Sequence, residues 1–218
     1  MRVAALYDIH GNLPALDAVL AELPEVDAIV IGGDVLPGPL ARETLDRIAS
    51  LENVHYVMGN GDREAIEEFP EVADWPATVS LDVDGLGPVL FCHGSPRSDT
   101  EMITTLTGED RIAPMLEGVS ERCVVGGHTH RQFDRTAYRW RFINAGSVGM
   151  PYEGATGAFW ALLGPGVELR RTDYDVNAAI EQLRAGGFDD VDEMLEESLI
   201  NPMDPDQVAQ LFEQGVTG

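Results

Sequence analysis

Short, largely apolar runs alternate with helical patterns over the first sixty residues. The runs at 3–7, 28–31 and 54–58 predict three buried strands. Between the first two runs, apolar residues recur at three- and four-residue spacings from Leu13, and Asn12 precedes them at the position of a helix cap. A second helix is predicted to begin at Pro39. This alternation is typical of βαβ units around a largely parallel sheet.

From Thr78 onward the pattern changes to a period of two, which indicates strands. We expect a second sheet built from the segments 79–83, 89–92, 123–125, 133–136, 140–144, 158–163 and 167–172, with Gly164-Pro165-Gly166 as the turn between the last two. Helical spacing returns after Asp175. The predicted architecture is therefore α/β, with two sheets packed face to face and helices outside them.

The last forty residues are acidic but keep helical spacing. Apolar side chains in the segment 191–199 predict an amphipathic helix that docks on the body, and Asn201-Pro202 ends it. Val208, Leu211 and Phe212 predict one more short helix, packed either on the body or on a second subunit of a homo-oligomer. We interpret residues 1–218 as one domain with a helical, acidic C-terminal segment from about 175.

Charge narrows the choice of partners. The chain has 38 Asp and Glu against 14 basic residues, all of them arginine, for a formal net charge of −24. A surface this negative repels polyanions, so neither nucleic acid nor an anionic membrane is expected as a partner. No apolar run reaches membrane-spanning length, and Cys92 and Cys123 lack the spacing of a disulfide framework. We therefore expect a cytoplasmic protein.

Metal-binding residue types follow the ends of five predicted strands. Each occurrence alone is weak, because an aspartate after a strand is more often a turn or helix cap than a ligand. Together they contain four of the five histidines of the chain, and only His55 is left for a structural role. The segments are Asp8-Ile9-His10, Gly33-Asp34, Gly59-Asn60, His93-Gly94 and Gly127-His128-Thr129-His130.

These segments predict a site for two divalent ions. The carboxyl ends of strands in an open α/β sheet meet in one crevice, and residues two apart in an extended segment point the same way, which would pair Asp8 with His10 and His128 with His130. Two carboxylates, four imidazoles and one amide suffice for two ions of manganese, iron or zinc if one carboxylate bridges them. Such a centre attracts phosphate and favours phosphoester hydrolysis.

The series resembles the calcineurin-like metallophosphoesterases, whose pattern is D-x-H, G-D, G-N, H and G-H-x-H. The match runs in order from Asp8 to His130, and the turn Asn144-Ala145-Gly146-Ser147 is similar to a motif of small bacterial and archaeal phosphodiesterases in this group. The resemblance implies a four-layer αββα sandwich of two mixed sheets flanked by helices. It also implies an intracellular enzyme that hydrolyses a small phosphodiester or phosphomonoester.

By position, the resemblance assigns Asp8, His10 and His130 to one metal, and Asn60, His93 and His128 to the other. Asp34 would bridge the two ions, and a bridging hydroxide would attack phosphorus, with Asp34, Asn60 and His128 as catalytic residues. We predict substrate contacts from Asn12, Arg63 and Ser147. Helix capping, surface ion pairing and turn formation are the alternative roles of these three residues.

The chain departs from the family at Gly61, where many members carry a histidine that assists the leaving group. Substrates with good leaving groups, or with their own proton donor, are therefore expected. Asp62, normally the partner of that histidine, is interpreted as the cap of a helix that begins at Arg63.

Two other functions remain open from the sequence. A nuclease is disfavoured by the acidic surface and by the lack of an added DNA-binding region. A non-catalytic or weakly catalytic metal-binding interaction scaffold is the second alternative, because the retromer subunit with this fold resembles the enzymes but lacks part of their ligand set. The three tryptophans, Trp75, Trp140 and Trp160, are expected to make core or subunit contacts.

Overall fold

Two five-stranded mixed sheets form the centre of the molecule within the described residues 1–216 of the computed structural model. The first sheet has the order β10-β9-β1-β2-β3 and the second β4-β5-β6-β8-β7. Strands of the first sheet are β1 (Val3–Leu6), β2 (Ala28–Ile31), β3 (Val54–Tyr56), β9 (Ala158–Leu163) and β10 (Val167–Thr172). Strands of the second are β4 (Thr78–Val83), β5 (Gly87–Cys92), β6 (Cys123–Gly126), β7 (Phe133–Ala137) and β8 (Trp140–Asn144).

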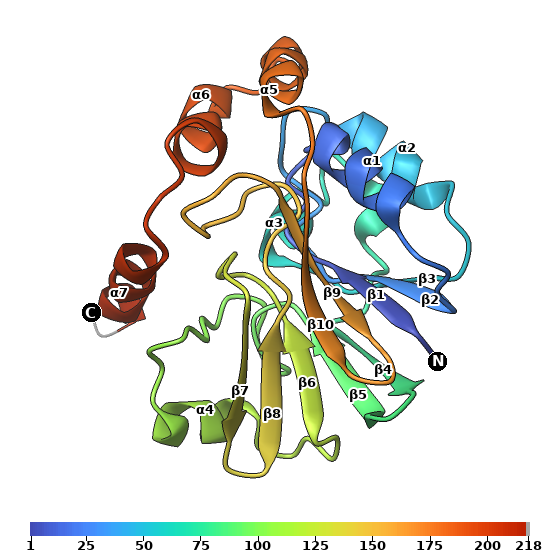
Figure 1. Ribbon diagram of the computed structural model, residues 1–218, viewed down its shortest axis with the longest axis vertical. Coiled ribbons are helices and arrows are strands. Elements are labelled where there is room, and N and C mark those ends of the chain that lie inside the picture. The colour runs from blue at the N-terminus through green and yellow to red at the C-terminus, as the bar shows by residue number, and fades with distance from the viewer. Residues whose placement is uncertain (217–218) are drawn as a thin grey trace.

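Helices cover the outer faces of both sheets (Figure 1). The helices are α1 (Leu13–Glu22), α2 (Ala41–Ala49), α3 (Asn60–Glu64), α4 (Glu109–Met115), α5 (Val176–Ala185), α6 (Val191–Leu195) and α7 (Pro205–Val216). A 3₁₀ turn, η1 (Pro70–Val72), follows α3, and a π-helical turn, η2 (Glu196–Ile200), continues α6. The second helix begins at Ala41, two residues after the predicted start at Pro39.

The alternation of side chains along β1 separates two layers of core. Val3, Ala5 and Tyr7 pack between the two sheets, whereas Ala4 and Leu6 pack against α1 and α2 on the outer face. A third cluster lies between the second sheet and α4. The predicted four-layer αββα sandwich is therefore confirmed, because each sheet buries one face against the other sheet and one against helices.

The prediction that β9 and β10 belong to the second sheet is wrong. β9 pairs antiparallel with β1, and β10 pairs with β9, so both strands extend the first sheet. All six residues of β9 are buried, so this strand needs cover on both faces and neighbours on both edges. Strand periodicity specifies that a strand exists but not which strand it pairs with.

The C-terminal helices pack on the body of the molecule. Leu183 of α5 packs with Leu195 and Leu199 of the segment formed by α6 and η2. In α7, Val208 is buried, and the backbone oxygen of Pro205 accepts a hydrogen bond of 3.0 Å from Arg131. Among the described residues, no helix has both the length and the apolar composition needed to cross a membrane.

Candidate metal centre

The predicted ligand residues lie just after the carboxyl ends of five strands, in loops or, for Asn60, at the first residue of α3. Asp8 and His10 follow β1, Asp34 follows β2 and Asn60 follows β3 in the first sheet. His93 follows β5, and the loop that contains His128 and His130 follows β6, in the second sheet. Because the sheets pack face to face, the ends of their parallel strands bring these loops into one crevice.

Five of these residues have a left-handed backbone. The φ angles of Asp8, His10, Asp34, His128 and His130 lie between 47° and 66°. The expected extended geometry is therefore wrong for these loops, which turn sharply at each ligand. A non-glycine residue in this region costs about 1–3 kcal/mol, and such strain is concentrated at functional sites.

The side chains converge into two groups. Asp8, His10 and His130 form one, and Asp34, His93 and His128 form the other, with the potential ligand atoms of each group within 4.8 Å of one another. His128 and His130 belong to different groups, which agrees with their assignment to different metals by the resemblance.

Asp34 lies between the two groups. Its Oδ2 atom is 3.3 Å from Nε2 of His93 and 4.0 Å from Nε2 of His10. Its Oδ1 atom accepts a hydrogen bond of 2.7 Å from the backbone N–H of Gly61. A carboxylate that faces one imidazole from each group is compatible with the predicted bridging role of Asp34.

The donor atoms of the site fit a pair of cations. Nε2 of His93, Nε2 of His128, Oδ1 of Asp8 and Oδ1 of Asn60 are buried and have no hydrogen-bond partner. Buried polar atoms are rarely left unpaired, because each costs about 1–3 kcal/mol. Nitrogen and oxygen donors that face one another in this way suit divalent manganese, iron or zinc.

Hydrogen bonds to the backbone orient two of the rings. Nδ1 of His93 is 3.0 Å from the carbonyl oxygen of Gly32, and Nδ1 of His130 is 2.6 Å from that of Met150. Both rings therefore present Nε2 to the site, as ligating histidines commonly do. Tyr152, which the sequence reasoning missed, stacks on His130 with ring centroids 4.9 Å apart.

Charge coupling within the site keeps its carboxylates ionised. Burial opposes the charge on Asp34, but the imidazoles of His93 and His10 hold the pKa of this carboxyl well below its usual range. Burial favours the neutral ring of His93, yet the neighbouring Asp34 raises its pKa to about 9. Burial, with the charge of His93, lowers the pKa of His128 to about 4. Nε2 of His93 faces carboxylate oxygens of Asp34 (3.3 Å) and Asp8 (3.8 Å), and a bound cation would replace a proton there.

Asp62 organises the Asp34 loop. Its carboxylate accepts hydrogen bonds from the backbone N–H groups of Asp34 (2.8 Å), Leu36 (3.0 Å) and Gly59 (3.1 Å). Asp62 lies inside α3, which begins at Asn60, so the predicted helix start at Arg63 is wrong. The bond to Gly59 still caps the helix, and the other two bonds connect α3 to the loop after β2. Burial and the charge of Asp34 raise the pKa of Asp62 to about 7.

Asp62→Ala is expected to lower the free energy of unfolding by about 3 kcal/mol or more, because three buried N–H donors lose their acceptor. Asp62→Asn keeps one acceptor oxygen and should cost less. Urea unfolding of both variants, with the exposed Asp46→Asn as a control, measures the difference. A loss below about 1 kcal/mol for Asp62→Ala would contradict this role.

Asn12 and Ser147 make bonds inside the protein. Asn12 caps α1 by accepting from the N–H of Ala15 (3.2 Å) and donates to the oxygen of Gly149 (2.9 Å). The hydroxyl of Ser147 donates to the backbone oxygen of Asp8 (2.7 Å) and accepts from the N–H of Met150 (2.7 Å). Both side chains are fully buried, and their substrate contacts stay a prediction.

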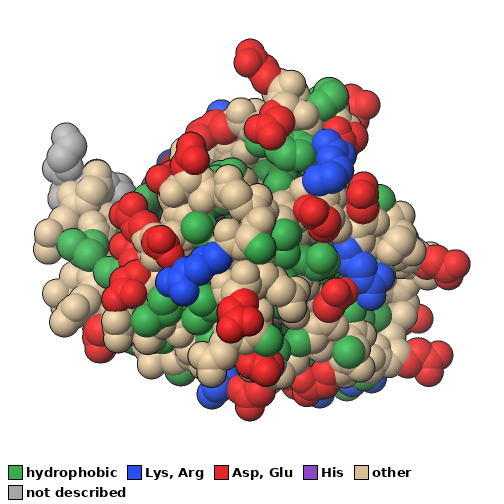
Figure 2. All heavy atoms as spheres, turned by 90° about the horizontal axis from the view of Figure 1, so that it is seen from above, with side chains coloured by type: hydrophobic (Ala, Val, Ile, Leu, Met, Phe, Trp, Pro, Cys, Tyr) green, Lys and Arg blue, Asp and Glu red, His purple; other side chains and the backbone are tan. Residues whose placement is uncertain are grey.

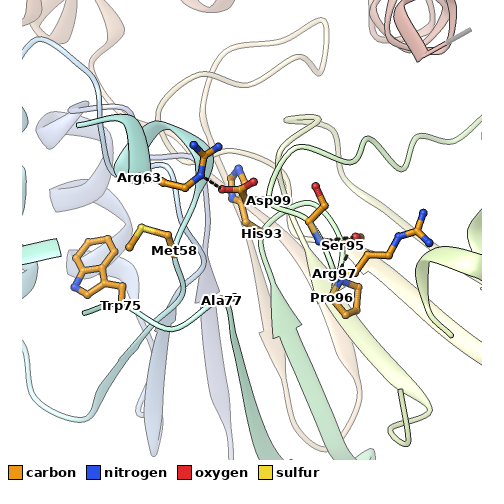
Figure 3. A pocket seen from close by; sticks show the side chains of 10 residues that line it. Met58, Arg63, Trp75, Ala77, His93, Ser95, Pro96, Arg97 and Asp99 are labelled. Atoms are coloured by element: carbon orange, nitrogen blue, oxygen red, sulfur yellow. Dashed lines mark hydrogen bonds and ion pairs between the residues drawn. The ribbon is translucent and has the colours of Figure 1, made fainter. Parts of the chain in front are cut away.

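Arg63 reaches the rim of a cavity of about 370 Å³ that begins at His93 (Figure 3). Its Nε atom is 2.6 Å from Oδ2 of Asp99, so the predicted substrate ligand is paired with an acid on the opposite wall. Arg97 also lines the cavity and is paired with Glu101. Two of the 14 arginines of this acidic protein therefore lie beside one ligand group.

Comparisons with solved structures agree on the fold. A metallophosphoesterase from Sphaerobacter thermophilus is similar, with a TM-score of 0.75, 24% identity, and coverage of 89% of this chain and 98% of that one. Hypothetical protein PH1004 from Pyrococcus horikoshii OT3 is similar, with a TM-score of 0.71, 19% identity, and coverage of 89% and 97%. Vps29 of Entamoeba histolytica, solved with Zn²⁺, is similar at a TM-score of 0.53 and 18% identity, covering 80% and 100%.

The amino-acid sequence shows the family to which the chain belongs. A comparison with curated proteins found no match. Residues 1–163, which contain every predicted metal ligand, match the calcineurin-like phosphoesterase superfamily domain. The ligand pattern occurs there in the order of the family, and the two sheets bring it together. The chain therefore belongs to the calcineurin-like phosphoesterase superfamily.

Proposed function

We propose that this protein is a metal-dependent phosphoesterase that hydrolyses a small phosphodiester or phosphomonoester. One ion is assigned to the group of Asp8, His10 and His130, and the second to His93, His128 and Asn60, with Asp34 shared. The four buried donor atoms without hydrogen-bond partners carry this proposal, because two cations would satisfy all four. When bound, two such ions neutralise phosphate oxygens and lower the pKa of a shared water molecule.

The chain's own residues prepare the site for a phosphate. Buried Asp34 stays ionised beside the imidazoles, and the N–H of Gly61 fixes its Oδ1 atom. The loops that hold the ligands are fixed in turn by bonds such as that from His128 N–H to Oδ2 of Asp8 (3.0 Å). The rigid placement of ligands before substrate arrives is what electrostatic catalysis requires.

No histidine stands at the position that assists the leaving group in many relatives. A Cβ atom on Gly61 would lie 2.2 Å from the carbonyl oxygen of Leu36, so the loop after β2 occupies the space of a side chain there. We therefore infer a preference for leaving groups of low pKa, which need no proton donor.

Two model esters test the proposed activity. Metal-free protein reloaded with manganese is expected to hydrolyse bis(p-nitrophenyl) phosphate and p-nitrophenyl phosphate, whose phenolate leaves without protonation. Phenyl phosphate should react far more slowly than the nitrophenyl monoester. No turnover of any ester despite two bound ions per chain, measured by elemental analysis, would favour the interaction scaffold instead.

Metal binding should also stabilise the fold. Each manganese ion, at about 100 times its dissociation constant, is expected to add about 2.7 kcal/mol to the free energy of unfolding, because only the folded chain assembles its ligand group. For a chain of this size, each bound ion corresponds to a rise of roughly 5–10 °C in melting temperature. Calorimetry of metal-free and reloaded protein measures it, and an unchanged melting temperature would argue against a metal centre.

We further propose that the substrate is a small cytoplasmic molecule and that nucleic acid is not bound. The net charge of −24 supports the second point. The buried free thiols of Cys92 and Cys123 are compatible with a reducing compartment. Absence of cleavage of single- and double-stranded oligonucleotides, measured under conditions where the nitrophenyl diester is hydrolysed, would support this restriction.

A further inference from the structure

Two separate cavities adjoin the metal centre. The cavity of about 370 Å³ begins at His93, and a second of about 310 Å³ begins at His10. His93 and His10 belong to different ligand groups, and no residue lines both cavities. A phosphate between the two groups therefore has space on each side for one substituent.

The size of the cavities exceeds what a phosphate alone would need. Each falls at the lower end of the range of about 300–1,000 Å³ typical of small-molecule sites. A monoester would use only one of them. The two spaces favour a phosphodiester, with one ester group in each.

The His93 cavity has an aromatic wall. Met58 and Trp75 lie on one side of His93, and Pro96 and Arg97 lie on the other, as Figure 3 shows. Trp75 stacks on Tyr56 with ring centroids 4.8 Å apart and an angle of 14° between the rings. This stacking holds the indole in place before a ligand arrives. Trp75, expected to be a core contact, therefore also lines the cavity.

The charges of the two cavities differ. Arg63 and Arg97 lie along the His93 cavity, where Asp99 is the acid among the lining residues. Asp190, Glu193 and Glu197 line the His10 cavity and would repel an anionic group. Figure 2, a view of the end of the molecule near α5 and α6, shows that carboxylates dominate the charged groups on this face. An anionic ester group is therefore disfavoured in the His10 cavity.

We propose that the substrate is a phosphodiester with one nucleoside-sized ester group whose planar aromatic ring stacks against Trp75 in the His93 cavity. Trp75 lines this cavity together with Met58 and Pro96, and an indole face binds flat rings without demanding a particular hydrogen-bond pattern. The second ester group, in the His10 cavity, is neutral or cationic. This inference rests on the proposed phosphoesterase function.

Two ligands that differ only in an aromatic base test whether a ring binds beside Trp75. AMP and ribose 5-phosphate share the phosphate and the sugar and differ in the base. Their binding to manganese-loaded protein is measured by titration calorimetry and by quenching of tryptophan fluorescence, with released phosphate assayed after each titration. AMP is expected to bind about tenfold more tightly, which corresponds to about 1.4 kcal/mol.

Two variants test whether the preference for AMP arises in the His93 cavity. Trp75→Leu removes the indole, and Ala77→Phe fills the cavity from an exposed position that tolerates a larger side chain. Both should bring the ratio of the two dissociation constants close to one. Tyr138→Leu, which removes an exposed aromatic ring from the β7–β8 turn, is the matched control and should keep the ratio.

The outcomes separate this inference from the proposed function. Equal binding of the two probes, or a ratio that persists in both cavity variants, would overturn the aromatic subsite. Hydrolysis of bis(p-nitrophenyl) phosphate without any preference for AMP would overturn the subsite and leave the phosphoesterase standing. A preference for AMP that both variants abolish supports the subsite, even where no ester is hydrolysed and the phosphoesterase function fails.

Discussion

Asp34→Asn and His93→Ala are each expected to lower manganese-dependent hydrolysis of bis(p-nitrophenyl) phosphate at least about 1,000-fold. Asp34 faces an imidazole of each ligand group, so the loss of its charge weakens the hold on both ions. Loss of His93 removes a buried imidazole nitrogen that faces the carboxylate of Asp34 at 3.3 Å and is proposed to bind one ion. Steady-state rates and bound manganese per chain are the two measurements.

The controls for these variants separate chemistry from folding. Asp34→Asn preserves the shape of the side chain and an oxygen that accepts from the N–H of Gly61, so circular dichroism should match the parent protein. Asp46→Asn makes the same chemical change at an exposed position of α2 and should leave the rate unchanged. Full activity in Asp34→Asn, with two ions still bound, would refute the bridging assignment.

Gly61→His is expected to destabilise the protein by about 2–3 kcal/mol and to give no faster hydrolysis of phenyl phosphate. The substitution restores the residue that many relatives carry. In this chain, however, the new Cβ atom would lie 2.2 Å from the carbonyl oxygen of Leu36 and 3.0 Å from Cδ of Pro37. The loop must move to accept any side chain, and that loop also carries Asp34. Urea unfolding and rates on phenyl phosphate measure both effects.

Two further glycine variants show whether the added Cβ atom or the imidazole ring causes the loss of stability. Gly61→Ala adds the Cβ atom without an imidazole and should cause most of the same loss of stability. Gly166→His adds the same ring in the β9–β10 turn, where a Cβ atom meets no other atom within 4 Å, and should be tolerated. If Gly61→His were as stable as the parent and faster on phenyl phosphate, the loop after β2 would be more adaptable than its contacts indicate.

Local sequence determined the elements and the ligand set. Hydrophobic periodicity is a property of a few neighbouring residues, and it located segments such as β8 (Trp140–Asn144) and β10 (Val167–Thr172) at their observed bounds. Asn12 was recognised as a helix cap because capping involves residues three positions apart. The ligands were found because strand ends and metal-binding residue types both appear in the order of the chain.

Partnerships between distant segments were decided by the tertiary structure. β9 pairs with β1, and all six of its residues are buried there. The apolar sequence of β9 would be the same if it paired with β8, so the sequence does not indicate its partner strand. The left-handed backbone at His128 and His130 is likewise not revealed by their spacing in the sequence. Asp62 accepts hydrogen bonds from the N–H groups of Asp34 and Leu36, and these bonds form only because α3 packs against the loop after β2.

The sequence by itself therefore determined the strands, most of the helices, the family and the set of candidate ligands, because these depend on patterns within short stretches of chain. Only the tertiary structure decided the sheet order, the left-handed loops at the candidate ligands, the absence of space at Gly61 and the two cavities beside the candidate metal centre. Most of these depend on distances between residues far apart in sequence, and such distances are set when the two sheets pack together.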